Sequence, residues 1–428
     1  MKINNGYFFF IIFISIYLVS FYLKIDVIKG AVPDLQTHWK YIQKLTNVGL
    51  LNILDIKLGN KTLNGLDSKL LNFPLHHIIV SQIPIINKNL NAYLNIFFFI
   101  SIIIPYLFYR CCVERFKDID KKKLFFFSSI LYILPNFQAA SIWGNNHNTA
   151  IIFFLIALFY LIKIEQAEKK NNFYIILTYL FLFLASYTKQ YYVIFFPIFF
   201  FKILIKFKFE FKIIYLSTIT CLILSIPGGI FLYNNLGLMQ NLSIGATNFS
   251  SSVVVVSTII SFYLIPFLLI EIINKNFDFK KTLKNKRFII SFITILIFTI
   301  YSSFNFIYDT QIGGGFFIKL NNLLFDNYFN YIILSILLSA IVMYFSRNHL
   351  MDNFTTLTLL ISFSSGWFIF QKYFEPMYLI MFVLLYDKKM LKGFFKNKLD
   401  YLYLYFLIYW VLYFIFKEND KFVSFFKI

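Results

Sequence analysis

The charged side chains that lie between long apolar segments are the residues of this sequence most able to do chemistry. Asp34 follows the first apolar run in Val-Pro-Asp-Leu-Gln-Thr-His-Trp, and His38 comes four residues later. A carboxylate in this place can act as a general base toward a substrate hydroxyl, and residues four apart share one face of a helix. Pro-Asp is also a good helix N-cap, so capping and catalysis are both open for Asp34.

Lys189 and Gln190 interrupt an otherwise apolar stretch, Ala-Ser-Tyr-Thr-Lys-Gln-Tyr-Tyr-Val. A charge near membrane depth is costly, which favours a functional interpretation. A lysine here can hold a phosphate group as a point charge. The alternative is a lysine that extends to the membrane interface beside Tyr191 and Tyr192, which would form an ordinary aromatic belt.

Lys372 and Glu375 form a second charged interruption, in Gln-Lys-Tyr-Phe-Glu-Pro. Two basic residues from distant parts of the chain, Lys189 and Lys372, can converge on one phosphate. The alternative is a salt-bridged turn, with Pro376 opening the next helix.

Other polar positions carry weaker signals. His76 and His77 are neighbours, and adjacent residues on a helix do not face each other, so they are poorly spaced as metal ligands. We expect no metal site, with one of the two histidines lining a pocket and the other facing the membrane interface. The Asn-Asn-His-Asn stretch 145–148 is typical of a turn between helices, with a substrate contact as the alternative. Asp309 lies in a later loop beside three glycines.

The elements that must position these residues are membrane helices. The chain has 428 residues, of which 59% are hydrophobic and 14% charged, and a bilayer core needs about 20 mostly apolar residues per helix. We predict an all-α polytopic membrane protein with one transmembrane domain over residues 1–428 and no separate soluble domain. The expected segments are approximately 6–24, 91–110, 124–143, 149–165, 172–188, 190–206, 213–234, 253–273, 288–307, 328–346, 354–371, 374–387 and 400–416.

The distribution of basic residues predicts the orientation. Lysine and arginine gather in alternate short loops, which places the N-terminus in the cytoplasm and leaves residues 25–90 as a long outer-face loop. In this loop we expect an amphipathic helix over 35–48 and a short, half-buried helix over 74–84. The formal charge of +20 follows from basic inner loops that attract anionic headgroups, so the expected partner is the bilayer and not a nucleic acid. The expected location is a bacterial inner membrane or the endoplasmic reticulum.

The arrangement resembles the GT-C superfamily of membrane glycosyltransferases, which also have a first helix, a large outer loop with an early acidic residue, and many further helices. Asp34 matches that acidic position, although Leu35 follows where many members have a second acid. Three stretches are similar to the dolichyl-phosphate-glucose α-1,2-glucosyltransferase branch. They are Leu-Asp-Ser-Lys-Leu-Leu-Asn-Phe-Pro-Leu-His-His from Leu66 to His77, Thr188-Lys189-Gln190 with Lys in place of Arg, and Lys372-Tyr-Phe-Glu375-Pro376-Met-Tyr without the family's Arg.

This resemblance implies an enzyme that moves a sugar, with inversion, from a polyprenyl- or dolichyl-phosphate donor to a lipid-linked or surface glycan acceptor. It implies no cofactor and no metal, and it casts Asp34 as the catalytic base. The residues that we expect to contact the substrates are His38, Asp67, His76, His77, Lys189, Gln190, Asp309, Lys372 and Glu375.

Two other functions are open to a protein of this composition. A transporter or flippase for a lipid-linked or small solute is one, but such proteins usually have repeats and polar groups at mid-membrane, whereas the charges here lie at the ends of segments. A polysaccharide polymerase or ligase is the other, and its usual signature is a large late outer loop. Residues 308–327 form a loop of only moderate length.

Overall fold

The computed structural model describes residues 5–25, 31–48, 73–234, 249–304, 314–325, 327–364, 369–396 and 399–418. Every regular element in these ranges is a helix, which confirms the predicted all-α class. Asp67 and Asp309, two of the expected substrate contacts, lie outside the described residues.

Among the described residues, six helices are long and apolar enough to cross a membrane, and a bent pair, Lys121–Ile133 with Pro135–Ile142, would make a seventh span. This supports a multi-pass membrane protein. The six helices are α1 (Asn5–Tyr22), α5 (Leu90–Arg115), α8 (Asn146–Gln166), α11 (Phe211–Asn234), α13 (Phe249–Ile273) and α17 (Tyr328–Ser346).

The predicted count of thirteen spans is not confirmed. Several predicted segments do form helices, but short ones, such as α10 (Phe195–Lys206), α18 (Leu350–Ser364) and α19 (Met377–Leu385). Because a helix rises 1.5 Å per residue, a helix of this length is well short of an apolar layer about 30 Å thick.

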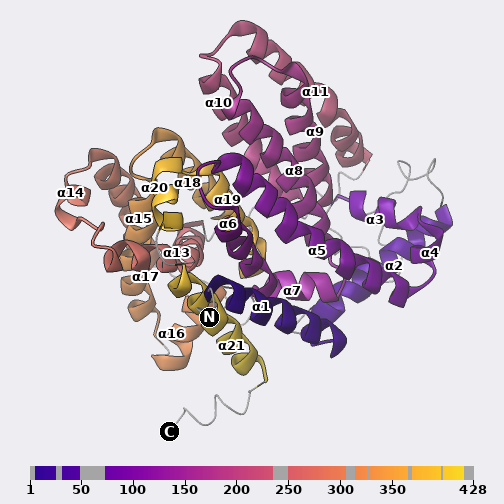
Figure 1. The fold of residues 1–428 in the computed structure, drawn as a ribbon, viewed down its shortest axis with the longest axis horizontal. Helices are drawn as coiled ribbons and strands as arrows, with labels where there is room; N and C mark the ends of the chain where they lie inside the picture. Colours follow the sequence, from indigo (N-terminus) through magenta and orange to yellow (C-terminus); the bar gives the residue numbers. More distant parts are fainter. Residues whose placement is uncertain are drawn as a thin grey trace. The chain divides into compact units, whose positions relative to one another are not determined.

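The chain packs as two compact units, which are described separately. Unit 2 comprises residues 14–114 and 135–243, and in it α8 packs along α9, beside α11 (Figure 1). The ring of Phe154 in α8 lies 4.5 Å from that of Phe195 and 4.9 Å from that of Tyr192. The further helices of this unit are α2 (Ala31–Val48), α3 (Leu75–Ser81), α4 (Pro84–Asn87), α7 (Pro135–Ile142), α9 (Asn172–Thr188), η4 (Gln190–Ile194) and α10.

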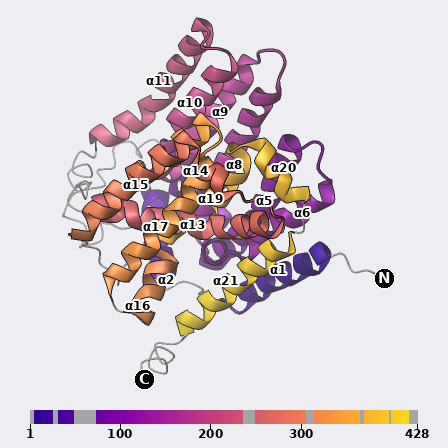
Figure 2. The ribbon, with the colours of Figure 1, turned by 90° about the vertical axis from the view of Figure 1, so that its left-hand side faces the viewer.

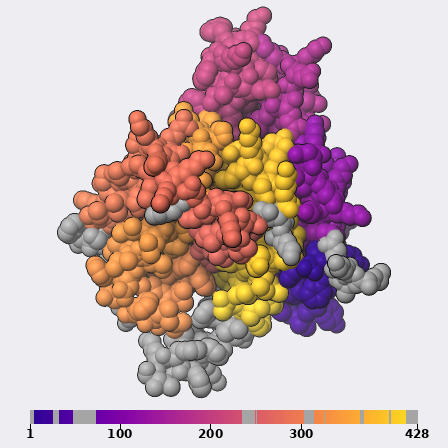
Figure 3. All heavy atoms as spheres, turned by 60° about the vertical axis from the view of Figure 1, so that its left-hand side comes forward, coloured from indigo at the N-terminus to yellow at the C-terminus, as the bar shows by residue number. Residues whose placement is uncertain are grey.

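Unit 1 comprises residues 1–13, 115–134 and 244–428. Its central helix is α13, which is buried over most of its length and contacts α15, α17, α18 and α21 (Figure 2). The orange and yellow helices of this unit form much of the face drawn in Figure 3. Its further helices are α6 (Lys121–Ser128), η3 (Ser129–Ile133), α14 (Phe279–Leu283), α15 (Lys286–Phe304), α16 (Gly315–Leu324), α18, η6 (Gln371–Tyr373), α19, α20 (Lys388–Lys396) and α21 (Asp400–Glu418).

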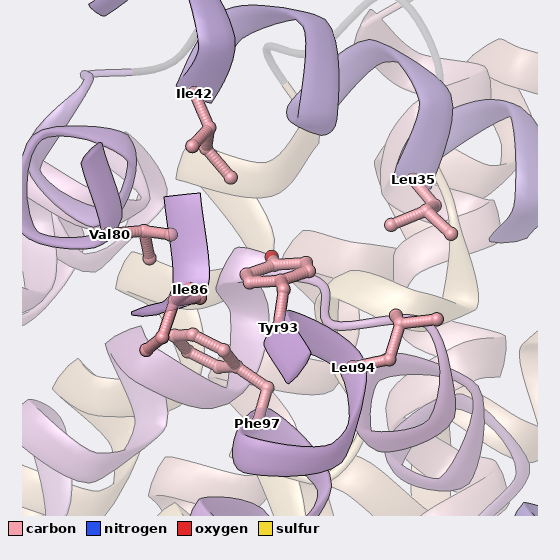
Figure 4. Close-up of a cluster of buried hydrophobic side chains, with 7 residues drawn as sticks. All are labelled: Leu35, Ile42, Val80, Ile86, Tyr93, Leu94 and Phe97. Atoms are coloured by element: carbon pink, nitrogen blue, oxygen red, sulfur yellow. The ribbon is translucent and has the colours of Figure 1, made fainter. Parts of the chain in front are cut away.

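The two short helices predicted in the first loop are present as α2 and α3, and α4 follows with Pro84 at its first turn, where a proline costs no hydrogen bond. A cluster of buried apolar side chains holds these helices on the start of α5 (Figure 4). Its members are Leu35, Ile42, Val80, Ile86, Tyr93, Leu94 and Phe97. The part of the loop that carries the candidate residues is therefore a packed layer of unit 2.

Candidate functional site

Helix α2 carries the first two candidate residues on neighbouring positions of one face. His38 is buried, as are Leu35 and Ile42, which are spaced along the same face of the helix. Asp34 lies one turn before His38 and is half-buried. The interpretation of Asp34 as an N-cap is wrong, because α2 begins at Ala31 and Asp34 lies inside its first turn. A carboxylate in that turn still complements the positive end of the helix dipole.

His77 in α3 is hydrogen-bonded directly to His38. The His38 Nδ1 and His77 Nε2 atoms are 2.8 Å apart, and the two rings lie 5.0 Å apart at 29°. The expectation that either His76 or His77 faces the membrane interface is wrong, since both side chains are fully buried. The reason is that α3 packs against α2, α8 and α9 at once, so the side of α3 left exposed carries Ile79 and neither histidine.

His76 is held by a hydrogen-bond chain that fixes its tautomer. The hydroxyl of Tyr93 donates to the carbonyl oxygen of Gly144, so it has no proton left for His76 and must accept from it. His76 Nε2, 3.1 Å from that hydroxyl, is therefore protonated. In the neutral ring His76 Nδ1 then accepts from Thr149 Oγ1 at 2.8 Å.

Gly144 is required where it stands for two reasons. Its φ is +58°, a conformation that side chains with a Cβ adopt rarely. A Cβ at this position would also lie 2.5 Å from the ring of Tyr93. The glycine thus allows Tyr93 to reach the turn before α8 and to orient His76.

Lys189 supplies the positive charge of this region. It is the C-cap residue that follows the last residue of α9, Thr188. Its amide donates to Ala185 O at 2.8 Å, and only 6% of its surface is exposed. Burial and then Lys189 lower the pKa of His77 to about 3. The pKa of His38 and that of His76 are also well below the usual range, first through burial, then through His77 and Lys189. At neutral pH these histidines are therefore neutral.

His147 completes the group, in the first turn of α8. Its Nδ1 lies 2.8 Å from the hydroxyl of Tyr191, its backbone amide donates to the capping side chain of Asn145, and it contributes to the lowered pKa of His38. Four of the five histidines of the chain thus gather in one buried region of unit 2. We call His38, His76, His77, His147 and Lys189 the histidine cluster.

Several buried polar atoms in this part of unit 2 have no hydrogen-bond partner among the described residues. They are His77 Nδ1, Trp143 Nε1, Asn146 Oδ1 and Asn148 Oδ1. Buried polar groups are nearly always paired, because an unpaired one costs about 1–3 kcal/mol. These atoms have hydrogen-bonding capacity that the described side chains do not use.

Unit 1 contains a second buried polar group, built around Glu375. One oxygen of its carboxylate accepts hydrogen bonds from the hydroxyls of Tyr263 at 2.8 Å and Tyr409 at 2.9 Å. The Gln371 side-chain amide donates to the same two hydroxyls, at 3.3 and 2.9 Å. We call these four residues the tyrosine–glutamate network. It joins α13, η6 and α21 within unit 1.

The remaining predicted contacts are spread over both units. Gln190 opens η4 directly after Lys189 and is half-buried. Lys372 lies in η6 of unit 1, half-buried, with its ammonium group 5.1 Å from the ring of Phe370. The convergence of Lys372 with Asp34 and Lys189 stays a prediction.

Within the described residues, no group of three or more histidine, cysteine or acidic side chains is arranged to hold a metal ion. The histidine cluster illustrates why. The facing nitrogens of His38 and His77 bind each other, and both nitrogens of His76 are used by Tyr93 and Thr149.

Sequence reasoning missed the contributions of Tyr93 and Thr149, and it considered His147 only within the stretch 145–148, as part of a turn with a substrate contact as the alternative. For His147 a signal existed, because the polar stretch 145–148 is unusual between two apolar segments. Tyr93 and Thr149 carry no comparable signal, since the chain has 30 tyrosines and apolar helices often contain threonine.

Comparison with protein-family models, with curated proteins and with solved structures found no match to this chain.

Proposed function

We propose that this protein is a membrane glycosyltransferase that moves a sugar from a polyprenyl- or dolichyl-phosphate donor to a glycan acceptor, with its reaction centre in unit 2. The observation that carries the proposal is the histidine cluster. It gathers His76, His77, His147 and one buried cation, Lys189, around His38 on the helix that carries Asp34. Perturbed titratable groups packed together in this way are typical of functional sites.

In the proposed reaction Asp34 is the general base. Its carboxylate takes the proton of an acceptor hydroxyl while the acceptor oxygen forms a bond to the anomeric carbon of the sugar. The bond from that carbon to the phosphate oxygen breaks on the opposite side, so the configuration inverts. The electron pair leaves with the lipid phosphate, which is a good leaving group and requires little acid catalysis.

Lys189 has the properties needed to stabilise the charge that develops on the leaving phosphate. A cation fixed in a largely buried position interacts more strongly with a developing anion than a solvated one does. Neutral histidines suit the same site, because each ring has one N–H donor and one acceptor, and sugar hydroxyls need both. His77 Nδ1, which is buried and unpartnered among the described residues, is a specific candidate for such a contact.

The test is a reconstitution with a panel of polyprenyl-phosphate sugars, scored for the release of polyprenyl phosphate. General-base catalysis contributes about 10²- to 10⁴-fold, so Asp34→Asn should lower the rate by that factor while the protein still inserts. The matched control is Asp278→Asn, at the exposed N-cap of α14, which should leave the rate unchanged. Retained activity in Asp34→Asn removes Asp34 from the mechanism. Release with no sugar of the panel, together with solute uptake by vesicles, favours a transporter.

A further inference from the structure

Two segments of unit 1 gather an unusual density of lysine. Lys392 Nζ in α20 lies 2.8 Å from Asp118 Oδ1, and Lys123 Nζ in α6 lies 3.4 Å from the carbonyl oxygen of Phe395. The two segments are therefore neighbours, as Figure 2 also shows. Together they contain Lys117, Lys121, Lys122, Lys123, Lys388, Lys389, Lys392 and Lys396 against the acids Asp118, Asp120 and Asp387. We call these eight lysines the α6–α20 basic patch.

The apolar side of α20 is already covered by its own unit. Leu391, Phe394 and Phe395 are buried, and the ring of Phe395 lies 5.0 Å from the rings of both Phe116 and Phe127. The lysines lie on the rest of the helix, which belongs to the yellow part of the surface in Figure 3. Of the patch, six lysines are exposed, and Lys388 and Lys392 are half-buried. The packing of α20 thus presents its lysines as a fixed surface.

This concentration of positive charge is unfavourable for the protein by itself. Lys121, Lys122 and Lys123 occupy the first turn of α6, where the helix dipole disfavours cations. Burial, and then Lys392 and Arg115, lower the pKa of Lys388. Asp118 and Lys392 form an ion pair across the two segments, so acidic residues offset part of this charge. A bound anion would offset this repulsion.

We propose that the α6–α20 basic patch is a docking site for the headgroups of anionic phospholipids. The α6 part of the patch follows directly on α5, which is apolar and long enough to span a membrane, and α20 precedes the apolar helix α21. The patch therefore begins where an apolar layer ends. Basic clusters in this position attract anionic lipids. The site is separate from the histidine cluster and does not depend on the proposed transferase activity.

The experiment uses the full-length protein in a non-ionic detergent, titrated with phosphatidylglycerol and followed by native mass spectrometry. Each lysine near an anionic surface raises the affinity of the protein for that surface about fivefold. The variant Lys388→Gln/Lys389→Gln/Lys396→Gln should therefore raise the Kd of the lipid by at least about tenfold. Phosphatidylcholine should bind equally weakly to the variant and to the unmodified protein.

The matched control is Lys280→Gln/Lys281→Gln/Lys284→Gln, which removes the same charge from exposed positions in and beside α14 of the same unit. It should change the Kd by less than about twofold. An equal loss of lipid affinity in the two variants would mean that binding depends on net charge in general, and this result would overturn the proposal. So would displacement of the lipid by inorganic phosphate at an ionic strength where chloride has no effect, because the site would then recognise free phosphate.

Should the first variant fail to fold, lysine footprinting of the unmodified protein gives an independent answer. In vesicles of phosphatidylglycerol the lysines of α20 should react with an amine reagent more slowly than in vesicles of phosphatidylcholine, by about fivefold. Lys280 and Lys281 should react at similar rates in both. Equal protection of α14 and α20, or none in either, contradicts the proposal.

Discussion

The histidine cluster of unit 2 and the tyrosine–glutamate network of unit 1 are both buried and polar, but they differ in how their hydrogen bonds end. In the network, two tyrosine hydroxyls receive a hydrogen bond from Gln371 and donate one to Glu375. In the histidine cluster, the chain from His38 ends on His77 Nδ1, which has no partner among the described residues. A buried network whose polar groups are paired with one another stabilises a fold. A network that ends on buried atoms without a hydrogen-bond partner leaves those atoms to pair with a ligand.

The two groups also differ in the sign of the charge that each one holds. The Glu375 carboxylate accepts hydrogen bonds from two tyrosine hydroxyls, which in turn accept from Gln371, and this arrangement stabilises an anion. Lys189 is a cation beside three neutral histidines, and its charge lowers the pKa of each of them. Under the proposed function, a phosphate would therefore be attracted to Lys189 and not to Glu375, and the tyrosine–glutamate network would contribute to stability alone.

The largest effect that separates the two groups should come from Lys189→Met. If Lys189 stabilises the leaving phosphate, its removal should lower kcat/KM for the lipid-phosphate donor by about 10²- to 10³-fold. The measurement is the steady-state rate of polyprenyl phosphate release in reconstituted vesicles. The control is Lys88→Met at the exposed end of α4 in the same unit, which should change the rate by less than about twofold. Equal rates for the two variants would leave Lys189 without a role in catalysis.

A smaller and purely structural effect is expected from Glu375→Ala. It leaves the buried hydroxyls of Tyr263 and Tyr409 without their acceptor, which should lower the free energy of unfolding by about 2–5 kcal/mol. Glu375→Gln retains an acceptor oxygen and should cost about 1 kcal/mol. Thermal unfolding in detergent gives both values. The transfer rate per folded molecule should be unchanged in Glu375→Gln, and a hundredfold loss there would mean that the network also takes part in catalysis.

The sequence predicted the helical class, the amphipathic helix that carries His38, and the short helix that carries His76 and His77, but it did not predict that Asp34 lies inside the first of these helices. These predictions are confirmed because apolar periodicity and flanking prolines can be recognised within the few residues that form each helix. The number of spans could not be predicted in the same way. An apolar run such as 374–387 looks like a span, but its helix covers only Met377–Leu385 and is buried inside unit 1. Apolar composition does not distinguish a lipid-facing helix from a buried one.

The candidate site was predicted only in part, for a related reason. Asp34, His38, His77 and Lys189 could be chosen because charged and imidazole groups are rare in this chain. Their partners could not be chosen, since the bond from His76 to Tyr93 depends on a turn at Gly144 that lies 51 residues beyond the tyrosine. The fixed tautomer of His76 and the pairing of His38 with His77 are products of tertiary packing, which no local pattern in the sequence encodes.

The smallest effect is a pH dependence confined to unit 2. His38, His76 and His77 are buried and neutral, and their pKa values are lowered, to about 3 for His77. In the unfolded chain a histidine has a pKa near 6.5. Below that pH the unfolded state binds more protons than the folded state, so stability falls as the pH falls from about 6.5 toward 3. Each of the three should cost about 1 kcal/mol between pH 7 and pH 5.5.

Hydrogen exchange at pH 7 and pH 5.5, corrected for the intrinsic rates, can measure this loss for each helix. The protection of backbone amides in α2 and α3 from exchange should decrease at the lower pH. Protection in α13 and α21 should stay the same, because the only histidine of unit 1 is His349, whose side chain is 58% exposed. His77→Gln should reduce the loss in α2 and α3 by about 1 kcal/mol. Lys189→Met should reduce it too, since without that cation the histidines accept protons in the folded state more readily. No decrease in α2 and α3 would mean that the histidines take up protons in the native state. An equal decrease in all four helices would mean that the loss is not specific to unit 2, and either result would remove the contrast between the two polar groups.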